Sequence, residues 1–149
     1  MFSQTVEYAL RAGVVLASDP DRSWKVREIA EAGCAPVHYL SKILQALARA
    51  GLVRSQRGLH GGYALARSPD DVSVYDLVSA IEPIPRLKRC PLGLAEHDSG
   101  LCPLHLRLDE AAERMEASLR ATTLAELLRK PGPGSPLCLR AEPKTRAPG

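Results

Sequence analysis

Aromatic residues are scarce in this chain of 149 residues, which contains one Phe, one Trp and four Tyr. The hydrophobic core must therefore be built mainly from Leu, Val, Ile and Ala, a composition that favours helices. The length is sufficient for one compact domain with its own core. These features predict a mainly α-helical protein.

Long apolar runs are also missing. No stretch approaches the roughly twenty apolar residues that a helix needs to cross a membrane. The N-terminal segment has no charged region followed by an apolar stretch and a cleavage site, so no secretory signal is evident. We therefore expect a cytoplasmic protein without a membrane partner. Its four cysteines should be reduced and serve as ligands or redox groups rather than as a disulfide framework.

Motifs of enzymatic chemistry are a third absence. The sequence contains no nucleophile–base motif, no phosphate-binding Gly loop and no cofactor fingerprint. An enzyme is therefore the less favoured class, and we expect no catalytic residues.

Positive charge is concentrated in one part of the chain. The formal net charge is only +3. Residues 22–67, however, hold eight Lys or Arg residues against two Glu, a net charge of +6 that leaves −3 for the rest. Such a basic segment favours a polyanionic partner such as nucleic acid; the alternative is a basic surface that contacts only solvent.

The periodicity of apolar residues predicts the order of the elements. Steps of three and four between Val6, Leu10, Val14 and Ala17 are typical of one helix face. Pro36 suits a first helical residue, because its missing N–H needs no partner there. Alternating apolar and polar residues around a Gly-rich tip are typical of a hairpin. We therefore expect helices at 3–17, 26–33, 36–50, 73–81, 103–120 and 123–128, and strands at 52–57 and 62–67.

This order is that of a winged helix-turn-helix, in which the second helix of the pair lies in the major groove of DNA. Polar residues off its apolar stripe suit base edges, and Lys42 suits a phosphate. Arginines on the wing suit a narrow minor groove, and glycines at its tip allow a close approach to the duplex. The alternative is that the two hairpins form only a packing unit. The expected DNA contacts are Val37, His38, Tyr39, Ser41, Lys42, Gln45, Arg54, Arg57, His60, Gly61 and Gly62.

Specific motifs accompany these elements: EYALRA at 7–12, VHYLSKIL at 37–44 and, in the wing, GLVRSQRGLHGGY at 51–63. The segments VSVYDLVSAIE at 72–82 and TLAEL at 123–127 extend the pattern. Over residues 1–128 the sequence thereby resembles the Rrf family of bacterial winged-helix regulators, which includes the iron–sulfur cluster regulator and the nitric-oxide-sensing repressor. The resemblance implies a homodimer, joined largely through the helix at 103–120, that binds a partly palindromic double-stranded DNA operator. It also implies a cluster near the dimer interface that tunes DNA affinity.

Ligands for a soft metal follow the winged helix. Cys90, His97, Cys102 and His105 fall within sixteen residues that contain little apolar bulk. Three Lys or Arg residues lie among the four positions before Cys90, and Cys102 lies at a helix N-terminus. Both settings favour the thiolate, which is the form that binds metals. The pattern indicates a metal or cluster site rather than a packed core.

The resemblance implies which residues serve as ligands. Family members with a cluster place three cysteines in this loop, six residues apart, and Cys90 and Cys102 match the outer two. The middle position is Glu96 here, so a set of three cysteines is missing. His105 matches the histidine ligand of the iron–sulfur cluster regulator, and Glu7 matches an acidic ligand that the nitric-oxide-sensing repressor supplies from the partner subunit. A [2Fe–2S] cluster with mixed ligation is therefore expected at Cys90, Cys102, one of the two histidines His105 and His97, and Glu7 of the partner subunit.

Other interpretations of the loop stay open. Its two cysteines and two histidines would also form a tetrahedral zinc site within one chain. A cofactor-free pair of thiols would sense oxidation directly, and in the simplest case the loop binds nothing. Cys34, in a tight turn, is expected to be a small buried residue, and Cys138 in the tail is expected to be incidental.

The expected organisation has four parts. Residues 1–82 form a winged helix-turn-helix domain with a small two-stranded wing, 83–102 a sensor loop, and 103–130 a long C-terminal dimerisation helix with a short terminal helix. Residues 131–149 form a disordered tail, because five Pro and three Gly occur there. The expected function is a transcriptional regulator, most simply a repressor, that senses redox state, iron or nitric oxide. The sequence does not tell whether the loaded or the empty form binds DNA.

Overall fold

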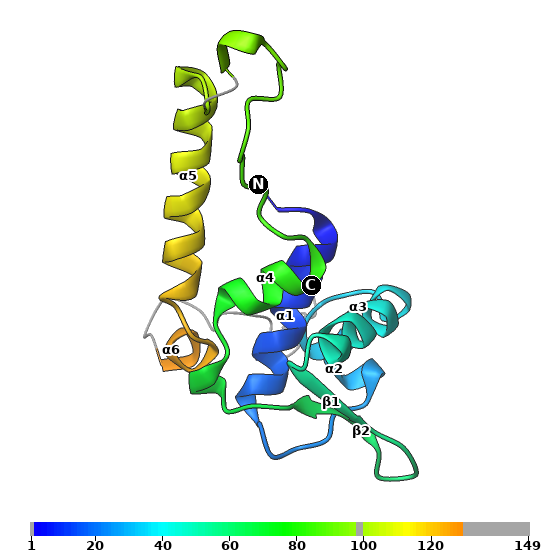
Figure 1. The fold of residues 1–149 in the computed structure, drawn as a ribbon. Helices are drawn as coiled ribbons and strands as arrows, with labels where there is room; N and C mark the ends of the chain where they lie inside the picture. Colours follow the sequence, from blue (N-terminus) through cyan, green and yellow to red (C-terminus); the bar gives the residue numbers. More distant parts are fainter. Residues whose placement is uncertain (1, 98–99, 130–149) are drawn as a thin grey trace, which may run out of the picture.

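The structure is a computed structural model of the chain, and it describes residues 2–97 and 100–129. Helix α1 (Gln4–Ser18) lies at the centre of the fold, and most of the other elements pack around it (Figure 1). Ser3 caps the helix, because its hydroxyl accepts a hydrogen bond from the N–H of Val6 (3.3 Å). Nine of the fifteen residues of α1 are buried, which is typical of a helix surrounded by its own protein.

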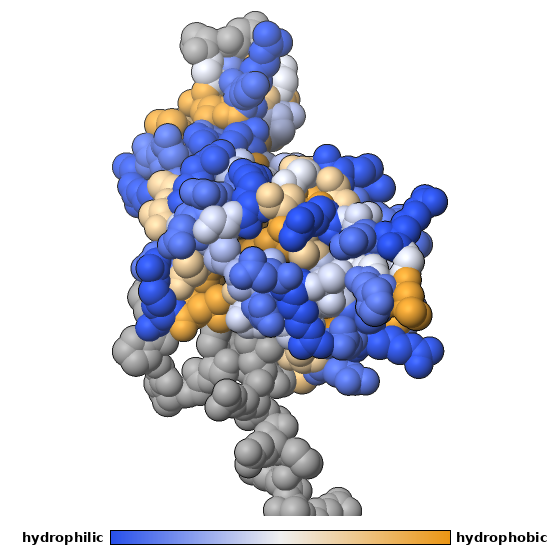
Figure 2. Space-filling view, turned by 90° about the horizontal axis from the view of Figure 1, so that it is seen from below, coloured by the Kyte–Doolittle hydropathy of each residue, from blue (hydrophilic) through white to orange (hydrophobic). Residues whose placement is uncertain are grey.

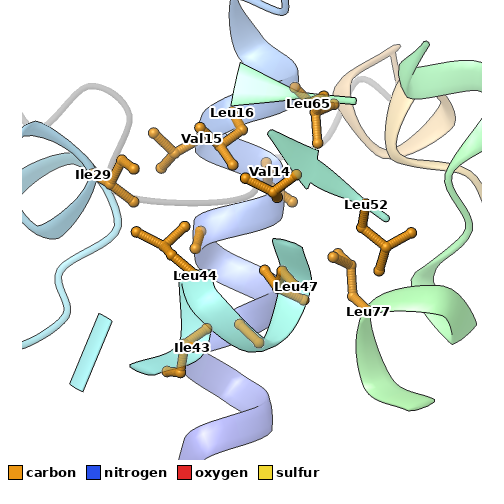
Figure 3. Packing of buried hydrophobic residues seen from close by; sticks show 14 of the residues in the cluster. Val14, Val15, Leu16, Ile29, Ile43, Leu44, Leu47, Leu52, Leu65 and Leu77 are labelled. Atoms are coloured by element: carbon orange, nitrogen blue, oxygen red, sulfur yellow. The ribbon is translucent and has the colours of Figure 1, made fainter. Parts of the chain in front are cut away.

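The helix-turn-helix consists of α2 (Val26–Ala32) and α3 (Val37–Arg49), which confirms the prediction. The N–H of Lys25 donates to the carboxylate of Glu28 (2.7 Å) and so satisfies a backbone donor at the start of α2. The apolar stripe of α3 packs against α1 in the main core (Figure 3). Its buried members are Leu40, Ile43, Leu44 and Leu47.

The wing is the antiparallel pair of β1 (Val53–Gln56) and β2 (Gly62–Leu65). Both strands are shorter than the predicted ones, and between them the chain turns at Gly58, whose φ of +102° is left-handed. Trp24 and Tyr63 exchange two backbone hydrogen bonds of 2.8 Å each. These bonds tie the wing to the segment that leads into α2.

Helices α4 (Val74–Ile81) and α6 (Leu124–Arg129) complete the body of the fold, and a short 3₁₀ turn, η1 (Pro69–Asp71), precedes α4. Ser73 and Asp76 form a capping box at the start of α4. Leu124 is fully buried, so α6 returns to the main core after the long helix described next.

Helix α5 (Pro103–Arg120) stands apart from this body, and the loop that precedes it contains the short 3₁₀ turn η2 (Ala95–His97) (Figure 1). The apolar residues of α5 pack only at its lower end, where Met115 and Leu119 are half-buried. At the other end, Leu104 and Leu108 are 64% and 53% exposed. None of the residues of α5 is buried within the described chain.

The prediction that Cys34 is buried is wrong, because its side chain is exposed. Gly33 caps α2, and the N–H groups of Cys34 and Ala35 donate to the carbonyls of Glu31 (3.3 Å) and Ala30 (3.0 Å). This Schellman pattern requires a left-handed residue after the cap, and Cys34 has φ +48°. The geometry of the turn, rather than packing, therefore determines where this residue lies.

Across the described ranges 2–97 and 100–129, no helix has the length and apolar character that spanning a membrane requires. The predicted disordered tail at 131–149, with Cys138, lies outside the described residues.

Candidate metal centre and nucleic-acid interface

Helix α5 begins with two of the predicted ligands. Cys102 is its N-cap residue and Pro103 its first residue. His105 lies on the first turn, where its Nδ1 is 3.0 Å from the Sγ of Cys102. The backbone N–H of His105, followed by its side chain, lowers the pKa of Cys102 to about 7. Unpaired N–H groups at a helix N-terminus favour a negative charge in this way.

Cys90, at the other end of the loop, also lies beside Cys102 and His105. It is the only buried residue among the described positions 83–97 and 100–102. Its Sγ lies 3.5 Å from the Nδ1 of His105 and 3.3 Å from the Nδ1 of His97, which is the last residue of η2. The ligand atoms of Cys90, Cys102 and His105 all lie within 4.8 Å of one another.

These separations suit a bound metal. Zinc–sulfur bonds of about 2.3 Å and zinc–nitrogen bonds of about 2.0 Å, at tetrahedral angles, place sulfur and nitrogen about 3.5 Å apart. The sulfur–nitrogen contacts of the loop are 3.0, 3.3 and 3.5 Å. Thiolate and imidazole are ligands that both iron and zinc accept. The separations therefore suit a single metal ion such as zinc, and the donor types also suit an iron–sulfur cluster.

Two acidic residues lie outside this group. Glu7 is on α1, where its carboxylate accepts hydrogen bonds of 3.1 and 3.2 Å from Arg11. Glu96 is exposed. The fold of one chain thus brings together three of the predicted ligands, with His97 beside Cys90, and Glu7 is not part of this group.

The predicted reading residues lie on the outer face of α3. Val37 and Tyr39 are 43% and 45% exposed. The side chains of His38, Lys42 and Gln45 are also exposed, while Ser41 is half-buried. The arrangement leaves polar groups of the helix accessible to a duplex, as a recognition helix requires.

The sequence reasoning missed Arg49 on α3. Its side chain is exposed, and together with Tyr39 and Lys42 it lines a groove between α1, α3 and α4. The sequence feature that could have identified Arg49 is its spacing from Lys42. Seven residues are nearly two helical turns, so both cations lie on one face of the helix.

Three of the five predicted wing contacts are exposed: the side chains of Arg54, Arg57 and His60. Gly61 is buried and Gly62 half-buried. Viewed from below, the side toward which the wing projects is mainly hydrophilic, and its apolar side chains form separate small groups (Figure 2). This surface suits a polar, charged partner.

Packing within the fold explains why glycine is required at two positions of the wing. A Cβ at Gly61 would overlap the carbonyl of Gln56, and one at Gly62 would overlap the carbonyl of Trp24. The tip is also tied down, because the Nζ of Lys25 donates to the carbonyl of Leu59 (3.0 Å). This bond, with the Trp24–Tyr63 pair, connects the wing to the start of α2.

Comparison with known proteins identifies the family. Residues 2–130 match the Rrf2 family, which is described as an iron-dependent transcriptional regulator. The transcriptional regulator NsrR of Geobacillus kaustophilus is 34% identical over 128 residues, which cover 82% of this chain and 85% of that protein.

Solved structures of similar proteins show the same fold. IscR of T. potens has a TM-score of 0.71 and 27% identity, with coverage of 86% of this chain and 85% of that one. CymR of B. subtilis, the global cysteine regulator, has a TM-score of 0.70 and 26% identity, with coverage of 85% and 95%. These relatives are regulators rather than enzymes, in line with the lack of catalytic motifs. The chain belongs to the Rrf2 family of winged-helix transcriptional regulators.

Proposed function

We propose that this regulator, most simply a repressor acting in the cytoplasm, senses redox state, iron or nitric oxide through a [2Fe–2S] cluster bound at Cys90, Cys102 and His105. The observation that carries the proposal is the convergence of these three ligands within 4.8 Å. The lowered pKa of Cys102 supports it, because the thiolate is available near neutral pH.

A [2Fe–2S] cluster needs four ligands, and two residues are candidates for the fourth position. His97 already contacts Cys90 (3.3 Å). Glu7 of the partner subunit is the alternative. When bound, such a cluster supplies reversible electron transfer, at a potential that histidine ligands raise.

The rest of the chain offers a route from the loop to DNA. Cys102 and His105 are on the first turn of α5, α5 packs against α4, and α4 packs against α3. A change in the loop that shifts α5 would therefore alter the presentation of α3. A coupling free energy of about 1–3 kcal/mol is typical of such linkage.

The proposed assembly is a homodimer joined through α5 on a partly palindromic operator. Its support is the exposed upper end of α5, where Leu104, Leu106 and Leu108 are 64%, 46% and 53% exposed. Three leucines in solvent on one helix are typical of a surface that another protein covers. In this dimer His38, Ser41 and Gln45 contact base edges, Lys42 a phosphate, and Arg54 and Arg57 the minor groove.

Anaerobic purification tests the proposal. We expect charge-transfer absorption bands together with iron and sulfide, and an operator affinity in gel shifts that changes when the cluster is lost. Cys90→Ala and Cys102→Ala are each expected to abolish loading. A colourless protein that contains zinc would favour the zinc site, and a metal-free protein whose DNA affinity follows thiol oxidation would favour the dithiol switch. Iron retained in both variants would refute the assigned ligands.

A further inference from the structure

Arg86 joins the start of the loop to the middle of α5. Its Nε and Nη2 donate to the two carboxylate oxygens of Asp109 at 2.8 and 2.9 Å. Its guanidinium also lies 3.6 Å from Glu116 and 4.0 Å from Glu113. Asp109 accepts a further hydrogen bond from the N–H of Leu87 (2.8 Å). We call these contacts the Arg86 clasp.

The clasp differs from an ordinary surface ion pair. Exposed pairs contribute little, because water screens them and both side chains stay mobile. Here the side chain of Asp109 is only 16% exposed, and the contact is a two-pronged one that fixes the geometry. The hydrogen bond from Arg86, followed by that from Leu87, lowers the pKa of Asp109 to about 2, so the carboxylate stays charged at neutral pH.

The clasp lies close to the ligands in the sequence. Arg86 precedes Cys90 by four positions, and Asp109 follows His105 by four positions. Because four residues are about one helical turn, Asp109 and His105 share one face of α5. The loop segment and α5 run in opposite directions side by side (Figure 1). The Arg86–Asp109 contact thus precedes the Cys90–His105 contact of 3.5 Å along the path of the loop.

Ile84 at the start of the loop packs in one apolar cluster with Leu119 of α5, but the leucines nearer the ligands are exposed. The helix has no buried residue in the described chain. Leu92 and Leu94 of the loop are 61% and 49% exposed, and Leu104 on the first turn of α5 is 64% exposed. Without the clasp, the segment before Cys90 would have to lose its conformational freedom when a metal binds, at a cost in affinity.

We infer that Arg86 is a positioning residue of this site: by clasping Asp109, it holds Cys90 against Cys102 and His105 before any metal or cluster binds. The expected effect of Arg86 on metal affinity rests on the proposed function. Its effect on the distance between the thiols of Cys90 and Cys102 does not depend on that function. Removing the clasp leaves every ligand in place but lowers the effective concentration of Cys90 at the site.

The first test uses the reduced, metal-free full chain and dibromobimane, a reagent that becomes fluorescent when it joins two thiols. We expect Arg86→Gln to slow the joining of Cys90 to Cys102 by about fivefold, with mass spectrometry identifying the joined peptides. Arg86→Lys keeps the charge but not the fork, so its rate is expected to be intermediate. Arg107→Gln is the matched control, because it removes an exposed ion pair of the same helix.

The second test measures Co²⁺ affinity from the sulfur-to-metal absorption band. Residues that orient metal ligands typically change affinity by about 10- to 100-fold. Because Arg86 acts through the chain that leads to Cys90, we expect Arg86→Gln to weaken Co²⁺ binding by about tenfold. Asp109→Asn should have a similar effect, and the double variant should be no weaker than either single one, since both remove the same contact.

Circular dichroism separates this role from a general loss of structure, because the helix content of Arg86→Gln should equal that of the wild-type protein. Equal joining rates for wild type, Arg86→Gln and Arg107→Gln at low salt would overturn the inference. Slower joining in the clasp variants, in a protein that binds neither Co²⁺ nor a cluster, would support the positioning role and reject the proposed metal function.

Discussion

The Sγ of Cys102 lies 3.0 Å from the Nδ1 of His105, and the backbone N–H of the same histidine stabilises the Cys102 thiolate. One residue thus supplies both a neighbouring candidate ligand and the donor that favours the charged sulfur. This is possible because Cys102 is the N-cap of α5, where the first N–H groups have no partner within the helix. A thiolate available near neutral pH is both a metal ligand and a target for oxidants.

The first prediction concerns the pH dependence of Cys102. Its pKa is lowered from 9.0 to about 7, so alkylation of Cys102 in the metal-free protein should rise through a midpoint near pH 7. Stability should follow, because the unfolded chain still binds this proton between pH 7 and 9 when the folded chain has released it. The free energy of unfolding should therefore rise over that interval and fall as the pH drops through about 7. Iodoacetamide rates measured by mass spectrometry, with urea unfolding, test both parts.

His105→Ala is the control for this prediction. It removes the imidazole but keeps the backbone N–H, which is the larger cause of the shift. The midpoint should therefore rise only part of the way toward 9.0. A wild-type midpoint already at the ordinary thiol value would contradict the prediction.

The second prediction concerns the fourth ligand. Because His97 already lies 3.3 Å from Cys90, His97→Ala should reduce iron retention on dilution by about tenfold or more. Glu7→Gln keeps the size of the side chain and should retain the cluster, while weakening the contact with Arg11. Iron and sulfide content after anaerobic gel filtration measures both variants. The reverse result would assign the position to Glu7 of the partner subunit.

The third prediction concerns the wing. Arg57 is exposed beside the tip, where Lys25 holds the backbone in place. Arg57→Ala should weaken operator binding by about three- to tenfold and reduce the slope of log affinity against log salt by about one. Gel shifts over a salt series measure both quantities. Arg114→Ala, an exposed cation on α5, should leave the slope unchanged, and an equal effect of the two variants would show that only overall charge matters.

Sequence reasoning succeeded where a pattern is local. The apolar stripe of α3, the Gly-rich turn of the wing and the N-cap position of Cys102 each depend on neighbouring residues, and each was predictable. The pairing of Trp24 with Tyr63 and the clasp between Arg86 and Asp109 join residues far apart in the sequence. Spacing gives no signal for such contacts, because they depend on how the loop returns beside α5.

The metal site lies between these cases. Its residue types and their order along the chain indicated a site, and the helix start brought Cys102 and His105 together as a local feature. The approach of Cys90 depends on the path of the whole loop, so the sequence could not rank His97 against His105. The prediction for Cys34 was wrong for a different reason. A small residue in a tight turn was expected to be buried, but the Schellman hydrogen bonds determine its conformation and leave its side chain exposed.

That conformation gives the last prediction. A residue with a Cβ is strained in the left-handed region, and Cys34 has φ +48° at a position where glycine is usual. Cys34→Gly should therefore raise the free energy of unfolding by about 0.5–1 kcal/mol, after the added entropy of the unfolded glycine is set against the relief of strain. Urea unfolding of the reduced protein measures the change. Cys34→Ala retains the Cβ and should show no gain, so equal stabilisation by Ala and Gly would mean that loss of the thiol, and not the backbone, accounts for the effect.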